Sequence, residues 1–81
     1  MRLDKFLKVS RLFKRRTVAQ DVLREGLVTV NGRLAKPATR VKPGDIVVVS
    51  LGGHTVKLEV RELNERVTAK EAPRLYRLLE G

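Results

Sequence analysis

Residues 14–32, KRRTVAQDVLREGLVTVNG, constrain the fold more than any other part of the chain. Apolar residues recur with a helical period over about Arg16–Glu25, and Gly26 suits the left-handed position that ends a helix. A short strand, Val28–Val30, follows. Asn31-Gly32 then predicts a two-residue hairpin turn, because both residues tolerate positive φ. The stretch therefore predicts a helix that packs on a small antiparallel sheet.

The flanking regions supply the remaining elements of this sheet and a first helix. Residues 2–11 predict that helix, with Leu3, Phe6 and Leu7 on one apolar stripe. Leu12 and Phe13 are expected to be buried in the connection to the second helix. Ile46–Leu51 is apolar throughout, as expected of a strand covered on both faces. Thr55–Arg61 alternates between apolar and charged residues, which predicts a strand with one buried face.

The C-terminal region, Thr68–Glu80, carries helical signals. Thr68 and Glu71 have the spacing of a capping box, and leucines recur at helical intervals after them. Pro73 falls about one turn into the segment and predicts an irregular start. We therefore expect a short C-terminal helix and an α+β fold of one domain, residues 1–81.

The positive charge is confined to one half of the chain. The net charge is +9, and residues 1–42 carry all of it, with twelve Lys and Arg against three acidic residues. Residues 43–81 balance six basic against six acidic residues. Because like charges repel one another, such clustering predicts a polyanionic partner. A basic surface kept only for solubility would not require the two halves to differ.

The residues that commonly carry catalysis are scarce. There is no cysteine, and the single histidine, His54, lies beside Gly52-Gly53 in an expected turn. No carboxylates cluster at metal-binding spacing, and no glycine loop has the Lys and Ser/Thr of a phosphate-binding loop. We expect no enzymatic activity, cofactor or metal. No apolar run is long enough to cross a bilayer, so we expect a cytoplasmic protein without a signal peptide.

The basic face favours binding to folded RNA. Few aromatic residues are available, and Phe6 and Phe13 fit apolar stripes better than exposed stacking platforms. The second helix exposes Gln20, Asp21 and Arg24, which would allow a DNA-reading role. Its basic residues nevertheless gather at its start and in the flanking segments, as expected of a phosphate clamp. The predicted RNA-binding residues are Arg2, Lys5, Lys8, Arg11, Lys14, Arg15, Arg16, Lys36 and Lys42, with Arg33 and Arg40 on the same basic face.

Two sequence blocks and one turn resemble the S4 RNA-binding domain family. The blocks are RLDKFL at the N-terminus and RRTVAQDVLREGLVTVNG, which ends in the family's G-x-V-x-V-N-G pattern. The turn is Lys42-Pro43-Gly44-Asp45, which matches K-x-G-D. Arg15 replaces the usual first serine of the S-R-S/T segment, whereas Arg16 keeps its arginine. The resemblance implies an S4-like (alpha-L motif) fold, with two N-terminal helices on a mostly antiparallel sheet, a core motif over 1–50 and a C-terminal hairpin and helix over 51–81.

Within this family, MRLDKFLKVSRLFKRRT, the chain length and the AKEAPRLY-like tail most resemble the stand-alone RqcP proteins of ribosome-associated quality control. This resemblance implies binding to the large ribosomal subunit after a stalled ribosome splits, with contacts to its rRNA and to peptidyl-tRNA. It also implies support for an RqcH-type partner that adds alanine residues to the nascent chain. We expect a monomer off the ribosome and no membrane contact.

The resemblance assigns roles to only some of the basic residues. Arg2, Lys5, Lys8 and Arg16 match motif positions, whereas Arg11, Lys14, Arg15, Lys36 and Lys42 depend on the charge argument. Asp4 also matches the motif, and we expect it to orient arginines as a supporting residue.

Three other functions remain open from the sequence. The first is a heat-shock-type or assembly factor that binds large-subunit rRNA or tRNA. The second is a DNA-binding or protein-interaction module. The third is a fragment of an enzyme whose catalytic domain would continue past Gly81.

Overall fold

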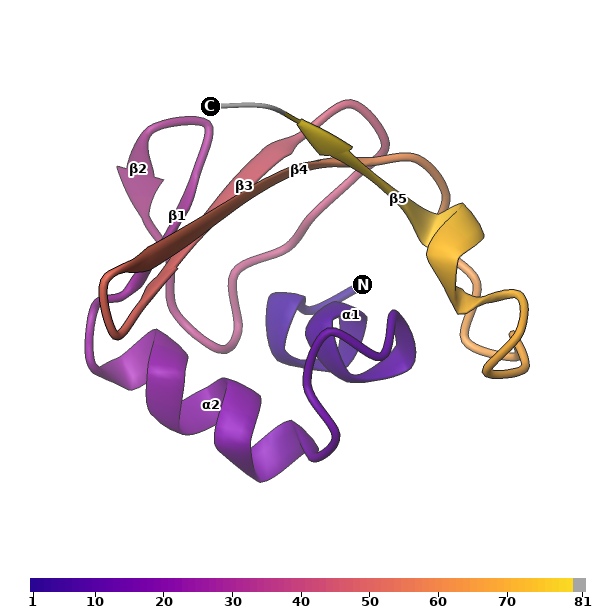
Figure 1. Cartoon of the computed structure of the whole chain (residues 1–81), viewed down its shortest axis with the longest axis horizontal. Helices are drawn as coiled ribbons and strands as arrows, with labels where there is room; N and C mark the ends of the chain where they lie inside the picture. The colour runs from indigo at the N-terminus through magenta and orange to yellow at the C-terminus, as the bar shows by residue number, and fades with distance from the viewer. Residues whose placement is uncertain (80–81) are drawn as a thin grey trace.

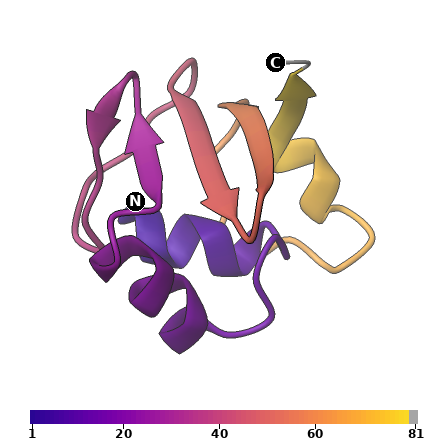
Figure 2. The ribbon, with the colours of Figure 1, turned by 60° about the vertical axis from the view of Figure 1, so that its left-hand side comes forward.

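The computed structural model describes residues 1–79 and places two helices on one face of a five-stranded sheet (Figures 1 and 2). The helices are α1 (Leu3–Val9) and α2 (Arg16–Arg24). The strands are β1 (Val28–Val30), β2 (Arg33–Leu34), β3 (Ile46–Leu51), β4 (His54–Val60) and β5 (Tyr76–Leu79), and a 3-10 turn, η1 (Ala72–Leu75), precedes β5. The α+β class and the two helices on an antiparallel sheet are confirmed.

The sheet has the strand order β2-β1-β3-β4-β5, and every neighbouring pair is antiparallel. β1 and β2 form the predicted hairpin, with Val30 opposite Arg33. Asn31 and Gly32 adopt φ values of 52° and 82°, the left-handed pair that a tight hairpin requires.

α2 ends in the predicted glycine cap. Gly26 has φ 76°, and its N–H donates to the carbonyl of Leu23 at 3.1 Å. The N–H of Leu27 donates to the carbonyl of Val22 at 3.3 Å, which completes a Schellman motif. This cap turns the chain directly from α2 into β1 and so fixes the helix against the sheet.

The core lies between the helices and the sheet. Leu3, Phe6 and Leu7 of α1 are fully buried there, as are Leu58 and Val60 of β4. Leu12 and Phe13 were expected to be buried but are only half-buried, since they line an apolar hollow of about 80 Å³ beside the β3–β4 hairpin. Two further apolar side chains of the predicted stripes are exposed, Val18 at 45% and Val56 at 39%.

The prediction that β3 is covered on both faces is wrong. Val47 and Val49 are buried, whereas Ile46 and Val48, on the opposite face, are only half-buried. Both helices pack on a single face of the sheet, so β3 buries alternate residues despite its uniformly apolar sequence.

The predicted C-terminal helix is also wrong. The capping box forms, because the N–H of Thr68 donates to Glu71 Oε1 at 3.1 Å and the N–H of Glu71 donates to Thr68 Oγ1 at 3.3 Å. Only the four residues of η1 coil after it, and residues 76–79 extend as β5 along the edge of β4. Pro73 lies in the first turn of η1, where a helix tolerates proline, so it does not end the helix. Pairing with β4 instead supplies the backbone of residues 76–79 with hydrogen-bond partners. Glu80, the expected end of the helix, lies outside the described residues.

Within residues 1–79, neither helix has the length or hydrophobicity needed to cross a membrane.

Candidate nucleic-acid interface

Asp4 lies at the centre of a hydrogen-bond network that joins α1 to α2. Its carboxylate is completely buried in the first turn of α1. Oδ1 accepts from the backbone N–H of Lys5 at 2.7 Å and from Arg16 Nη2 at 3.1 Å. Oδ2 accepts from Arg2 Nη2 at 3.2 Å and from Gln20 Nε2 at 2.9 Å. One carboxylate therefore fixes the positions of three side chains from the two helical segments.

The donors around Asp4 keep it ionised. Burial alone would raise its pKa, because the charged form loses its water. The hydrogen bonds from Gln20 and Arg16 and from the Lys5 backbone outweigh burial, and the pKa of Asp4 lies below its ordinary value of 3.8. The network therefore contains a buried negative charge matched by two partly exposed positive ones.

The two arginines on Asp4 remain accessible. The side chains of Arg2 and Arg16 are each 42% exposed. A guanidinium has five N–H donors, so pairing with Asp4 leaves donors for a second anion. Asp4 thus holds two cationic side chains, fourteen residues apart in the sequence, beside one another at the surface.

The segment between β2 and β3 packs on the start of α1. The backbone N–H of Leu3 donates to the carbonyl of Thr39 at 2.7 Å, and that of Asp4 donates to the carbonyl of Pro37 at 3.3 Å. The backbones of Arg2 and Arg40 form an isolated antiparallel β-bridge. These bonds place residues 36–40, with the exposed cations Lys36 and Arg40, next to the Asp4 network.

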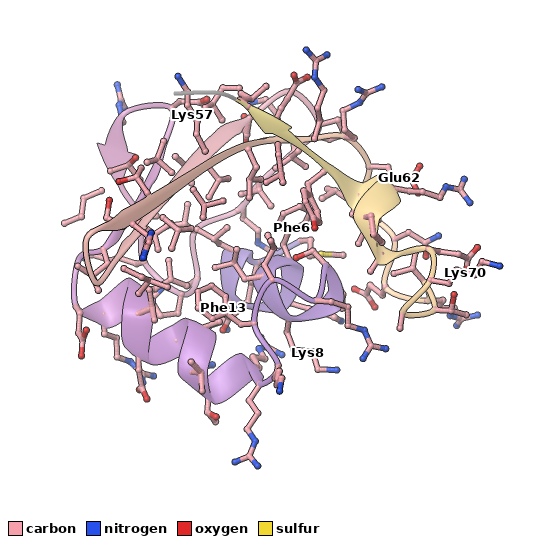
Figure 3. The ribbon with its side chains drawn as sticks, viewed as in Figure 1. Phe6, Lys8, Phe13, Lys57, Glu62 and Lys70 are labelled. Atoms are coloured by element: carbon pink, nitrogen blue, oxygen red, sulfur yellow. The ribbon has the colours of Figure 1, made fainter. Side chains whose placement is uncertain are left out.

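Four more of the predicted cations are exposed on α1 and the connection to α2: Lys8, Arg11, Lys14 and Arg15. None of them forms an ion pair within residues 1–79. Figure 3 shows Lys8 on the side of α1 away from the sheet, whereas Lys57 lies on the sheet side of the molecule. Arg11 adopts φ 66°, a left-handed conformation that glycine adopts at lower cost.

Lys5 and Lys42 differ from these free cations, because each already has a carboxylate partner. Lys5 Nζ lies 2.8 Å from Glu65 Oε1, in the segment before η1. Lys42 Nζ lies 3.0 Å from Asp45 Oδ1. An RNA phosphate that binds either lysine must therefore compete with a carboxylate of the protein.

Asp45 forms a second buried network, at the K-x-G-D turn. Besides Lys42 Nζ, it accepts from the backbone N–H of Lys42 at 2.9 Å and from Asn31 Nδ2 at 3.1 Å. Asn31 Oδ1 in turn accepts from the backbone N–H of Ile46 at 2.9 Å. Burial opposes these bonds, but the hydrogen bonds from Lys42 prevail and the pKa of Asp45 is lowered. This network ties the β1–β2 hairpin to the start of β3.

Two residues of the site were missed or misplaced by sequence reasoning. Gln20 was expected to be exposed but is half-buried and donates to Asp4. Its spacing of four residues from Arg16 places both on one face of α2, and this signal would have found it. Glu65 gives no such signal, because sixty residues separate it from Lys5.

The arrangement suits phosphate binding. It combines oriented guanidinium groups, which match phosphate geometry, with flexible free lysines nearby. Within residues 1–79, no group of three or more His, Cys, Asp or Glu side chains is placed to hold a metal ion.

Comparison with known proteins identifies relatives of this chain in sequence and in fold. Residues 1–47 match the family model of the S4 domain. The chain is 53% identical to the RQC P-site tRNA stabilizing factor of Halalkalibacterium halodurans, over 94% of this chain and 86% of the relative. It is 48% identical to the protein of the same name in Bacillus subtilis, over 99% and 93%. The solved structure of Vibrio cholerae heat shock protein 15, described as trimeric, superposes with a TM-score of 0.88 at 32% identity, over 98% of this chain and 81% of that one.

Proposed function

The chain belongs to the S4 domain family and, within it, to the group named RQC P-site tRNA stabilizing factor, and from that membership we propose that it binds RNA of the large ribosomal subunit together with P-site tRNA. The observation that carries the proposal is the Asp4 network. It presents Arg2 and Arg16 together, beside cations that have no partner in residues 1–79. Because the two guanidinium groups are preorganised, they favour a rigid, closely spaced array of phosphates, such as folded RNA offers.

The charge suggests how strongly binding depends on salt. If five to seven of the cations contact phosphates, affinity falls by roughly four to six decades per decade of salt. The proposed phosphate-binding residues are Arg2, Lys5, Lys8, Arg11, Lys14, Arg15, Arg16, Lys36 and Lys42. Lys5 and Lys42 contribute less than the others in this proposal, since Glu65 and Asp45 already hold their ammonium groups.

We further propose a role in ribosome-associated quality control in the cytoplasm. The protein would hold peptidyl-tRNA on the large subunit after a stalled ribosome splits. An RqcH-type partner would meanwhile add alanine residues to the nascent chain. The protein would act without catalysing a reaction, as one domain over residues 1–81, and would be monomeric off the ribosome. Sedimentation of the free protein tests the last point, and a trimer would contradict it.

The test is co-sedimentation with large subunits that carry peptidyl-tRNA. We expect binding by the wild type and a loss of about tenfold or more in Arg16→Ala, because the guanidinium is lost. Lys57→Ala is the control, since it removes one positive charge from the sheet side of the molecule. Equal losses in both variants would mean that net charge alone governs binding, and would contradict the proposed interface.

The same assay distinguishes the proposed function from a heat-shock-type or assembly factor, the alternative that the likeness to the Vibrio cholerae protein favours. In that case, binding to large subunits would be equally strong with and without peptidyl-tRNA. The proposed function requires stronger binding when peptidyl-tRNA is present. Equal affinity for duplex DNA and structured RNA at matched salt would count against both.

A further inference from the structure

The ion pair between Lys5 and Glu65 connects the basic N-terminal half of the chain to the C-terminal half, in which basic and acidic residues balance. Lys5 is on α1, among the proposed phosphate-binding cations. Glu65 belongs to the long segment between β4 and η1, the orange stretch that leads into η1 in Figure 1. The two charged atoms are 2.8 Å apart, and the side chains are 36% and 57% exposed.

The position of Glu65 does not depend on this ion pair. Leu63 and Val67, two residues before and after it, are partly buried and pack on the core. The N–H of Arg66 donates to Asn64 Oδ1 at 2.9 Å, which adds a local turn between these anchors. An exposed ion pair contributes little to folding by comparison. The carboxylate is therefore held over Lys5 by the segment that carries it.

We infer that Glu65 is a built-in counter-charge that RNA must displace from Lys5, and that it thereby sets the affinity of the interface. The inference rests on the proposed RNA-binding function. A carboxylate oxygen close to an ammonium group occupies the place where a phosphate oxygen would bind. The lowered pKa of Glu65, caused first by its hydrogen bond to Lys5, shows that the pair favours the charged carboxylate.

Displacement has a signature in the salt dependence. When a phosphate replaces Glu65 on Lys5, the RNA releases a counterion while Glu65 takes one up from solution. Lys5 therefore adds almost nothing to the net ion release of the wild type. Without the carboxylate, Lys5 adds a full contact, and the salt slope steepens by about 0.7–0.9.

The test compares Glu65→Gln with the wild type in titrations of a structured rRNA fragment at several salt concentrations. We expect affinity to rise about two- to fivefold at low salt and the slope to steepen as above. The melting temperature should stay nearly unchanged, since Leu63 and Val67 still hold the segment.

Glu59→Gln is the matched control. It changes the net charge by the same amount, from the face of β4 opposite the buried Leu58 and Val60. We expect it to leave the salt slope unchanged. An unchanged or lower affinity in Glu65→Gln, or an equal gain in Glu59→Gln, would overturn the inference. If neither the wild type nor any variant binds the RNA, the proposed function itself fails.

Discussion

The two buried aspartates of the domain resemble each other in chemistry and differ in what they hold. Asp4 and Asp45 are both at most 5% exposed, both accept several hydrogen bonds and both have a lowered pKa. Asp4 accepts from one backbone N–H and from three side chains, and two of these side chains are arginines that remain exposed. Asp45 draws on a backbone N–H, on Asn31 and on the lysine three residues before it. The Asp4 network presents two arginines at the surface, whereas the Asp45 network ties the β1–β2 hairpin to the start of β3.

This difference shows that a buried, hydrogen-bonded carboxylate is not by itself a sign of a binding site. What differs is whether the buried carboxylate brings together cations from separate segments that still have donors for a ligand. Asp4 does this with Arg2 and Arg16, whereas Asp45 holds a single cation, Lys42, from its own turn. We therefore assign the Asp4 network to the interface and the Asp45 network mainly to the scaffold.

The largest expected effect follows Asp4→Asn. The amide cannot accept all four hydrogen bonds and carries no charge, so Arg2 and Arg16 lose their common anchor. We expect the free energy of unfolding to fall by about 2–3 kcal/mol. This loss is smaller than that for a fully buried ion pair, because both arginines are partly exposed. RNA affinity should fall about tenfold or more.

Denaturant unfolding and RNA titration measure the two effects. Val22→Ala is the control, because it opens a cavity on the inner face of α2 at a cost of about 1–3 kcal/mol. It should destabilise the fold comparably while RNA affinity is retained. A variant at Asp4 that binds RNA normally would remove the distinction between the two networks.

Asp45→Asn should lower stability without weakening RNA binding. The substitution weakens the bonds to Asn31 and Lys42, and we expect a loss of about 1–2 kcal/mol in unfolding free energy. RNA affinity, measured well below the melting temperature, should not fall, because the substitution also releases Lys42 from its carboxylate partner. A tenfold loss of affinity here would place this turn in the interface as well.

Acid should destabilise the protein through both networks. A carboxylate with a lowered pKa in the folded state stabilises the fold above its unfolded pKa, which is near 3.8 here. That contribution is lost as the pH falls from about this value through the folded pKa. Urea unfolding at a series of pH values should therefore show a steep loss of stability below about pH 4, and each Asp→Asn variant should show a shallower one.

The smallest expected effect is a gain in stability from Arg11→Gly. Arg11 has φ 66°, and glycine adopts this conformation without a Cβ clash, so we expect a gain of up to about 1 kcal/mol. RNA affinity should nevertheless fall about two- to threefold, because a cation is lost. Arg11→Ala should show the same loss of affinity without the gain in melting temperature. Unchanged RNA affinity in both variants would exclude Arg11 from the interface.

The sequence predicted those parts of the fold that depend on local signals. The glycine cap at Gly26 and the Asn31-Gly32 turn were found because their conformations are set by neighbouring residues. The C-terminal region failed for the opposite reason. Its capping box forms, but β5 is selected by the free edge of β4, which lies far away in the sequence.

The contacts of the candidate site also divide into predictable and unpredictable ones. Arg2, Asp4 and Arg16 stand at positions of a sequence motif, so their proximity could be expected from the sequence. The Lys5–Glu65 pair depends instead on how the chain returns to α1 after β4. Local periodicity contains no information about such a return.

β5 also has a consequence for the solubility of the protein. It covers one edge of β4, a strand of seven residues, by pairing residues 57–60 with residues 76–79. A chain shortened by this terminal strand would present a row of unpaired amides and carbonyls next to apolar side chains, which invites other molecules to add strands. β5 therefore protects the domain against aggregation, and shortened forms intended for binding assays should retain it.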